Sequence, residues 1–222
     1  SPFKGARLLI TLHGSEILNF SRFFPQSLLF RRLLRRSDRI HVLSQHNKDI
    51  LLEKFPELET KIRLIPGAPS RHVLPIDEED ARAKNGSKLR IVTVGRLHPR
   101  KGQDQMLDAL GNLPSDLKQT VEYLLVGPKS NSRYADQIEV KSKKIGVSVK
   151  LVGDLEATKL REVYAEADIF ALTSTYHKRS VEGFGFVYLE AASHGLPAIA
   201  HRIGGVEDAV LHEETGLLVP HD

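Results

Sequence analysis

Residues 182–190 read EGFGFVYLE, and this stretch decides the fold of the chain and the kind of site that it carries. Glu182 and Glu190 stand eight residues apart, with Gly183 and Gly185 between them. Glycines let a backbone turn approach a ligand closely, and a helix that begins at such a turn offers free N–H groups to an anion. A phosphate at the turn, with a carboxylate on each side of it, predicts a sugar nucleotide as ligand.

A second phosphate-binding pattern lies upstream of this stretch. Residues 89–94, LRIVTV, predict an apolar strand, and an amphipathic helix follows at 103–110. The loop between them, GRLHPRKG at 95–102, is basic and has glycine at both ends. A strand, a basic loop and a helix in this order form a phosphate-binding arrangement. Arg96 can bond two phosphate oxygens with its planar fork, and Lys101 can add a point charge.

The rest of the chain alternates short apolar strands with helices, which predicts parallel α/β structure. In the first third we expect a buried strand at 8–12, a helix at 25–36, a strand at 39–43, a helix at 45–54 and a strand at 61–65. In the last two thirds we expect strands at 90–94, 121–126, 149–152, 169–173, 198–201 and 216–219. Helices at 103–112, 134–145, 158–167, 185–194 and 206–211 are expected between them.

Composition excludes several classes of protein. The 222 residues are 41% hydrophobic, which is ample for a packed core, and no run approaches the ~20 apolar residues of a membrane span. Cysteine is absent, which excludes a disulfide framework and a cysteine metal site. The formal charge of +4 suits anionic substrates or an anionic membrane surface, and it is too small to indicate nucleic acid.

Taken together, these residues resemble the retaining glycosyltransferases of the GT-B fold, most closely family 4. The resemblance runs nearly end to end. Besides the two glutamates and the basic loop, it is carried by TLHG at 11–14, VLS at 42–44, LLVG at 124–127, Val152-Gly153 and Gly204-Gly205. It implies an α/β fold of two Rossmann-like domains that face each other across a cleft, the first one incomplete.

The resemblance also implies a division of labour between the domains. Residues 1–72 would be the latter part of an N-terminal, acceptor-side domain, 73–87 a linker, and 88–222 the donor-binding domain. In this family the leading strands would precede Ser1 and a closing helix would follow Asp222. We therefore expect the 222 residues alone to bind a nucleoside diphosphate weakly and to transfer no sugar, since acceptor contacts would be missing.

The implied reaction moves a sugar from a nucleoside-diphosphate sugar to a hydroxyl acceptor, which would be a glycan, a glycolipid or a small molecule. The anomeric configuration would be retained, and neither a cofactor nor a metal would be needed, since the Asp-x-Asp signature of metal-dependent transferases is absent. The expected catalytic residues are His13, Arg96, Lys101 and Glu182. The expected substrate-binding residues are Gly95, Val152, Gly153, Leu155, Gly183, Phe184, Gly185 and Glu190, with Glu190 on the ribose hydroxyls.

Two departures from the family pattern qualify these expectations. Residues 66–70 read PGAPS where the family usually has Pro-Asn-Gly-Val-Asp, which puts the contacts near the hinge in doubt. Residues 204–208 read GGVED in place of Gly-Gly-x-Pro-Glu, and it is open whether Asp208 replaces the family glutamate. Two rival functions also stay open: a sugar-nucleotide epimerase of the same fold, and a non-catalytic module that binds a nucleotide sugar or a membrane surface.

Two basic segments have alternative interpretations. Arg31, Arg32, Arg35 and Arg36 lie on one expected helix, where they form a solvated face or contact an anionic membrane. The absence of cysteine fits a cytoplasmic protein, and the second interpretation would place it peripherally on the inner face of a membrane. Residues 176–179, YHKR, form either a solvated loop or cations that meet a phosphate or an acidic acceptor.

Overall fold

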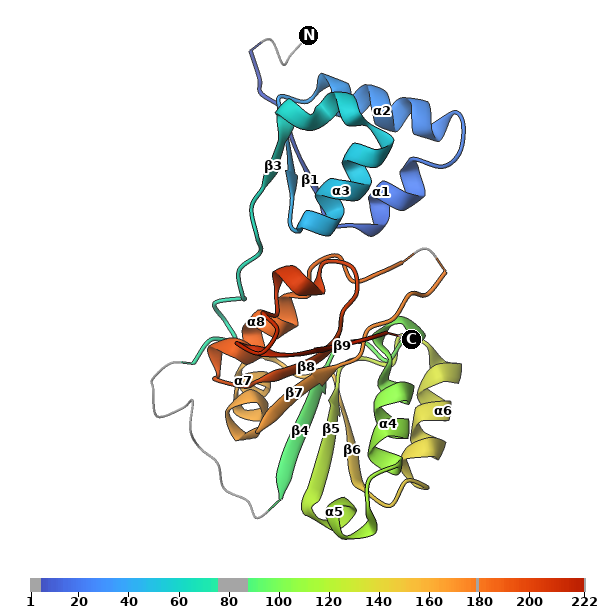
Figure 1. Ribbon diagram of the computed structural model, residues 1–222, viewed down its shortest axis with the longest axis vertical. Coiled ribbons are helices and arrows are strands. Elements are labelled where there is room, and N and C mark those ends of the chain that lie inside the picture. Colours follow the sequence, from blue (N-terminus) through green and yellow to red (C-terminus); the bar gives the residue numbers. More distant parts are fainter. Residues whose placement is uncertain (1–4, 76–87, 179, 222) are drawn as a thin grey trace.

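The computed structural model describes residues 5–75, 88–178 and 180–221, which form two parallel α/β units joined by an extended segment (Figure 1). The first unit has a parallel sheet of order β1-β2-β3, formed by β1 (Leu9–Leu12), β2 (Arg39–Val42) and β3 (Ile62–Leu64). Its helices are α1 (Ser15–Phe20), α2 (Gln26–Arg36) and α3 (Gln45–Lys54), followed by the 3₁₀ turn η1 (Pro56–Lys61).

The helices of the first unit cover one face of its sheet, and the core lies between them (Figure 1). Leu12, Ile40 and Ile62 point from the three strands into this core. The expectation of a buried strand at 8–12 is wrong in one respect, because Leu9 in β1 is 63% exposed. The strand lies at the edge of the sheet, and among the described residues nothing covers its outer face.

The second unit has six parallel strands in the order β6-β5-β4-β7-β8-β9. They are β4 (Leu89–Val94), β5 (Val121–Val126), β6 (Ser148–Gly153), β7 (Ile169–Leu172), β8 (Ala198–His201) and β9 (Gly216–Val219). From β4 the chain adds β5 and then β6 on one side of β4, and it then crosses to β7 on the other side of β4. Ligands of open α/β sheets bind outside the carboxyl ends of the strands at such a reversal. The predicted Rossmann-like α/β fold is confirmed.

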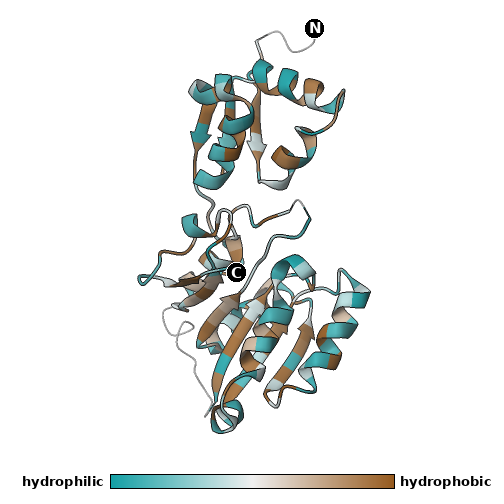
Figure 2. Ribbon diagram, turned by 45° about the vertical axis from the view of Figure 1, so that its right-hand side comes forward, coloured by the Kyte–Doolittle hydropathy of each residue, from teal (hydrophilic) through white to brown (hydrophobic). Residues whose placement is uncertain are grey.

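Two helical layers cover the sheet of the second unit. Residues of α4 (Gln103–Gly111) and α6 (Ser132–Ser142) share one core cluster with Tyr123 and Leu125 of β5. Residues of α7 (Ala157–Glu166) and α8 (Phe186–Ser193) share the other with Leu124 and Val126. This alternation is the period of two that a strand buried on both faces requires. Figure 2 shows the apolar strands between helices whose outer surfaces are hydrophilic.

Several short helical elements differ from what the sequence patterns predict. The helices α1 and α5 (Ser115–Thr120) and the 3₁₀ turn η3 (Pro99–Lys101) were not predicted. The helix expected at 206–211 is wrong, because only a 3₁₀ turn, η4 (Val206–Asp208), forms there. The N–H of Leu211 donates to the hydroxyl of Thr215 rather than to a helical carbonyl, which ends the turn early. Among the described residues, none of the helices has the length and apolar character that a bilayer crossing needs.

The segment between the units runs along α8. Gly67 lies against the rings of Phe184 and Phe186, so closely that a side chain at this position would overlap both. Further on, the carbonyl of Val73 bonds Nε2 of His194 at 2.7 Å. Residues 76–87, most of the predicted linker, lie outside the described residues.

Candidate functional site

Two loops meet where the sheet of the second unit reverses direction. One follows β4 (residues 95–102) and the other follows β7 (residues 173–185), and the two strands are neighbours. The hydroxyl of Thr173 donates to the carbonyl of Gly102 at 2.8 Å, and the N–H of Thr175 donates to the carbonyl of Arg100 at 2.8 Å. These bonds fix the basic loop against the loop that carries Glu182.

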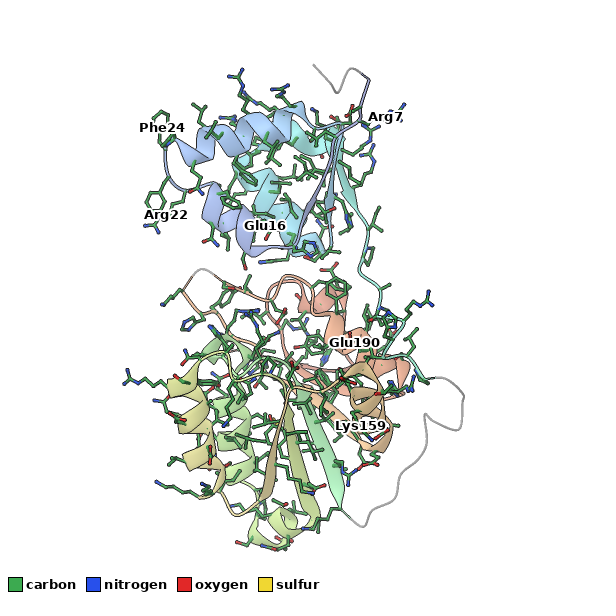
Figure 3. The ribbon with its side chains drawn as sticks, turned by 180° about the vertical axis from the view of Figure 1, so that it is seen from behind. Arg7, Glu16, Arg22, Phe24, Lys159 and Glu190 are labelled. Carbon is green, nitrogen blue, oxygen red and sulfur yellow. The ribbon has the colours of Figure 1, made fainter. Side chains whose placement is uncertain are left out.

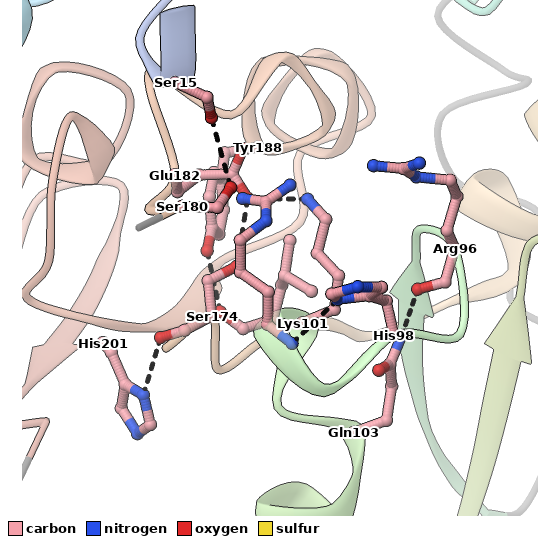
Figure 4. A network of polar contacts seen from close by, with 12 residues as sticks. Ser15, Arg96, His98, Lys101, Gln103, Ser174, Ser180, Glu182, Tyr188 and His201 are labelled. Atoms are coloured by element: carbon pink, nitrogen blue, oxygen red, sulfur yellow. Dashed lines mark hydrogen bonds and ion pairs between the residues drawn. The ribbon is translucent and has the colours of Figure 1, made fainter. Parts of the chain in front are cut away.

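A buried charge network joins the two loops (Figure 4). One carboxylate oxygen of Glu182, Oε2, accepts from Lys101 Nζ at 2.6 Å, from Arg100 Nη1 at 3.2 Å and from Ser174 Oγ at 3.1 Å. Glu182 is 8% exposed. The expected site residues Lys101 and Glu182 are therefore brought together, and they pair with each other.

The electrostatics of this network favour an ionised carboxylate. Burial by itself would raise the pKa of Glu182, but the charges of Lys101 and Arg100 hold that pKa below its ordinary value. Burial lowers the pKa of Lys101, and the Glu182 carboxylate opposes this shift. One carboxylate that accepts from three donors fits the charged form, so the network holds Lys101 rigidly at the carboxyl end of β4.

The helix α8 begins with an open N-terminus beside this network. Gly185, its N-cap, has φ +89°, a conformation that favours glycine, and a Cβ there would collide with the ring of Tyr188. No side chain caps the helix. Tyr188 donates its hydroxyl to the carbonyl of Leu172 at 2.7 Å, which ties the first turn of α8 to β7. The free N–H groups of this turn can therefore bind an anion.

Glu190 lies further along α8, beside the segment that joins the units (Figure 3). Its Oε2 accepts from the hydroxyl of Tyr164 at 3.2 Å, and its carboxylate also accepts from the backbone N–H of Ser70. Burial raises the pKa of Glu190 above its ordinary value, although these two hydrogen bonds oppose the shift. Glu182 and Glu190 thus have separate partners, as two carboxylates with different roles would.

The two units touch at the glycine turn. Gly183 packs against the carbonyl of His13 so closely that a Cβ would overlap the oxygen. Its own carbonyl accepts from Asn47 Nδ2 at 3.2 Å. Both carboxylate oxygens of Asp208 lie 3.1 Å from the N–H of Gln45, at the start of α3. Asp208 therefore binds a helix N-terminus in the other unit, where a negative charge is favourable.

His13 is placed at this contact mainly through its backbone. Its N–H donates to Glu16 Oε1, and its side chain is exposed. Arg96, the other expected cation, is also exposed, and its carbonyl accepts from Gln103 Nε2 at 2.9 Å. Among the described residues the guanidinium of Arg96 has no carboxylate partner.

A cavity of about 700 Å³ opens beside Arg96, where the two units meet. Its lining comes from the first unit and from both loops of the second. The lining residues are Ser15, Asn19, Arg96, His98, Arg100, His177, Lys178 and Ser180.

Three expected substrate-binding residues lie elsewhere. Val152 and Gly153 line a different cavity, of about 760 Å³, together with residues of α6 such as Ser142. Leu155 packs against the hydrophobic core beside α7. The structure therefore does not gather these three with Glu182. In the described ranges, no group of three or more histidine and acidic side chains is arranged to hold a metal ion.

Sequence reasoning missed three residues of the network and of the contact between the units. Arg100 precedes Lys101 in the basic loop, and its charge was a signal that could have been used. Ser174 and Asn47 carried no such signal, because each acquires its role from a partner far along the chain.

A comparison of the sequence with protein-family models finds one described as "Glycosyl transferases group 1", which matches residues 76–222. Among curated proteins, the GDP-mannose-dependent alpha-(1-6)-phosphatidylinositol monomannoside mannosyltransferase of Mycolicibacterium smegmatis is 28% identical over 96% of this chain and 56% of its own length. The D-inositol 3-phosphate glycosyltransferase of Rhodococcus jostii is 32% identical over 85% of this chain and 43% of its own. The chain spans about half the length of these relatives.

Solved structures of the same shape include Anabaena HepE in complex with UDP and glucose. It superimposes with a TM-score of 0.76 and 25% identity over 96% of this chain and 58% of its own. The likeness covers both units of the described chain.

Proposed function

The chain belongs to the glycosyl transferases group 1 family and has its GT-B fold, and from this premise we propose that the whole protein is a retaining glycosyltransferase. It would take a sugar from a nucleoside-diphosphate sugar and pass it to a hydroxyl acceptor: a glycan, a glycolipid or a small molecule. One observation carries the proposal. The buried network of Lys101, Arg100 and Glu182 lies beside the open N-terminus of α8, at the point where the sheet reverses.

The chemistry needs positive charge at the leaving group. When the anomeric bond breaks, negative charge develops on the diphosphate, and groups already fixed there lower the barrier without rearranging. Lys101 is held by Glu182, and the N-terminus of α8 is held by Tyr188, so both are fixed in advance. Arg96, exposed beside them, would complete the diphosphate site.

Retention of configuration is proposed to proceed without a covalent intermediate. The only carboxylate in the network, Glu182, already accepts three hydrogen bonds through Oε2, which makes it a poor nucleophile. Front-face attack, assisted by the leaving diphosphate, requires no protein nucleophile. Because arginine and lysine neutralise the diphosphate, the proposal requires neither a metal nor a cofactor.

The remaining expected roles are part of the proposal. Glu190, half-buried and already bound to hydroxyl and N–H donors, would accept the ribose hydroxyls. His13, at the contact with Gly183, would face the donor sugar, and the backbone of Phe184 would contact the phosphate or the sugar. UDP and glucose bound to HepE, and the GDP-mannose in the name of the mycobacterial relative, support a sugar nucleotide as donor.

A membrane contact is proposed for the first unit. Phe24 is 80% exposed and, with Arg22, projects from the side of this unit, from the loop between α1 and α2 (Figure 3). The neighbouring helix α2 exposes Leu29 and Leu33. Of the four arginines on α2, Arg31 and Arg35 pair with Glu57, and in the described part of the chain the other two, Arg32 and Arg36, have no acidic partner. Such a surface suits the cytoplasmic, inner face of an anionic membrane, and the lipid in the relative's name supports it.

The proposal is tested by binding. Nucleoside diphosphates with different bases are screened by thermal shift with the whole protein. A ligand at 100 times its dissociation constant should add about 2.7 kcal/mol of stability. Arg96→Ala should weaken binding of the nucleoside diphosphate by about 1.5–3 kcal/mol and leave the bare nucleoside unaffected. Arg39→Ala, an exposed arginine at the amino end of β2, serves as the matched control.

The outcomes separate the proposal from its rivals. Equal losses for nucleoside and nucleoside diphosphate in Arg96→Ala would contradict the assignment of Arg96. Interconversion of a sugar nucleotide with no acceptor present would favour an epimerase. Binding with no transfer by the whole protein would favour a non-catalytic module. The 222-residue chain alone is proposed to bind the nucleotide without transferring the sugar.

A further inference from the structure

The cavity beside Arg96 carries more positive charge than a donor diphosphate requires. Arg96, Arg100 and Lys178 line it together with two histidines, and no aspartate or glutamate is among its lining residues. Glu182 offsets part of the charge of Arg100 from behind, but it lies closer to Lys101. Among the described residues Lys178 has no acidic partner.

One histidine of this cavity, His98, is oriented as a donor. Nδ1 of His98 lies 3.1 Å from the N–H of Arg100 and accepts from it, so a neutral His98 carries its proton on Nε2. The rings of His98 and His177 meet edge to face with centroids 5.2 Å apart. The pKa of His98 is lowered by burial first and then by the charges of His177, Arg100 and Arg96, an environment that an anion would relieve.

The two residues that flank the turn at Lys178 are bonded to each other. His177 and Ser180 exchange two backbone hydrogen bonds of 3.1 and 3.0 Å, and Lys178 between them has φ +56°. A lysine in this left-handed region is uncommon, and such conformations gather at ligand sites. The hydroxyl of Ser180 lies 3.1 Å from that of Ser15, so the first unit holds the turn in place.

The cavity is also separate from the parts of the site that suit the donor. Lys101, Glu182 and Glu190 are not among its lining residues, whereas Ser15 and Asn19 come from the first unit. A ligand in this cavity would touch both units, with Arg96 and Arg100 on its donor side. In the proposed reaction this cavity would give an acceptor access to the donor sugar, because it lies between the two units beside Arg96.

We propose that His98, His177 and Lys178 form a second anion subsite, next to the donor diphosphate, which binds the phosphate group of a phosphate-bearing acceptor. The inference rests on the proposed function, whose site it extends. Beside Arg96, the cavity is lined by Arg100, Lys178 and two histidines, and His98 presents an Nε2–H; this set matches the charge and the several acceptor oxygens of a phosphate. The phosphate would belong either to a water-soluble sugar or polyol phosphate or to a phospholipid headgroup.

The test measures binding of inorganic phosphate to the whole protein while a nucleoside diphosphate saturates the donor site. Phosphate should still bind, and its affinity should fall as salt is raised. Lys178→Asn removes the charge and keeps a residue that tolerates the left-handed conformation. It should weaken phosphate about tenfold, the lower range for a hydrogen bond to a charged group, and change nucleoside diphosphate affinity less than about twofold.

Two further variants control this result. His177→Gln should also weaken phosphate selectively, and an unchanged melting temperature in either variant shows that the fold is intact. Lys144→Asn removes an exposed lysine that follows α6, outside the cavity, and should change neither affinity. Strict competition between phosphate and the nucleoside diphosphate, or equal losses of both ligands in Lys178→Asn, would overturn the second subsite.

A displacement experiment then identifies the source of the phosphate. Displacement of inorganic phosphate by inositol phosphate would assign a soluble acceptor, and displacement by vesicles of phosphatidylinositol would assign a lipid headgroup. Displacement by neither would overturn the proposal. If none of the nucleoside diphosphates binds, the result counts against the proposed function instead. A failed second subsite can therefore be told apart from a failed proposed function.

Discussion

Removing the positive charge of Lys101 is the most direct perturbation of the buried network. We expect Lys101→Met to destabilise the second unit strongly, because Glu182 would keep its charge and lose its nearest partner, 2.6 Å away. The side chains of Lys101 and Glu182 are 12% and 11% exposed, so water can replace the lost interaction only in part.

The magnitude follows from this burial. Removing one partner of a buried ion pair costs about 3–5 kcal/mol. Arg100 and Ser174 still donate to the same carboxylate oxygen, which places the expected cost near the lower end, about 3 kcal/mol. For a chain of this length, that change lowers the melting temperature by about 6–12 °C.

The assay is thermal or urea unfolding at several pH values. The lowered pKa of Glu182 means that the wild-type network contributes stability above the ordinary pKa of a glutamate. That contribution is lost as the pH falls through the lowered pKa. The variant lacks Lys101, so its Glu182 takes up a proton at higher pH. The gap between wild type and variant should therefore be widest near neutral pH and shrink in acid.

Two comparisons make the reasoning refutable. Lys159→Met removes an exposed lysine that pairs with Glu162 on the outside of α7, and it should change stability by less than about 0.5 kcal/mol (Figure 3). In a Glu182→Gln background, Lys101→Met should cost less, with a coupling energy of about 0.5–3 kcal/mol. The ion pair would not be the source of the lost stability if Lys101→Met cost as much in the Glu182→Gln background as in the wild type. The same would follow if the stability difference between wild type and variant did not change with pH.

Three other expectations follow from the site. Glu190→Gln should abolish discrimination between ribose nucleotides and their 2′,3′-dideoxy analogues in calorimetry, and retained discrimination would count against the ribose role. The melting temperature of this variant should match or exceed that of the wild type, because the raised pKa of Glu190 means that its ionisation opposes folding at neutral pH. Gly183→Ala should separate the units, seen as a larger radius of gyration in small-angle scattering, because its Cβ would overlap the carbonyl of His13; an unchanged radius would refute the contact. Transfer by the whole protein should continue in EDTA, and loss that added metal restores would contradict a diphosphate site built from arginine and lysine.

The sequence by itself determined the elements and their surroundings. Every expected strand of both units forms, because apolar runs of four to six residues between turn signals have few other ways to become buried. The loop at 95–102 and the glycine turn at 183–185 both lie at carboxyl ends of neighbouring strands, since alternation of strands and helices dictates a parallel sheet. Short elements such as α1 were missed, because a six-residue helix gives too little periodicity to detect.

The tertiary structure alone decided which side chains meet. Lys101 and Glu182 were both expected at a phosphate site, yet they are 81 residues apart and bind each other because β4 and β7 are neighbours in the sheet. The contact of Asp208 with α3 spans 163 residues and depends on how the two units dock. Sequence patterns record which face of an element is buried, whereas the partner of a buried charge is fixed by strand order and by docking. The sequence around a single aspartate or lysine indicates neither the strand order nor the docking of the two units.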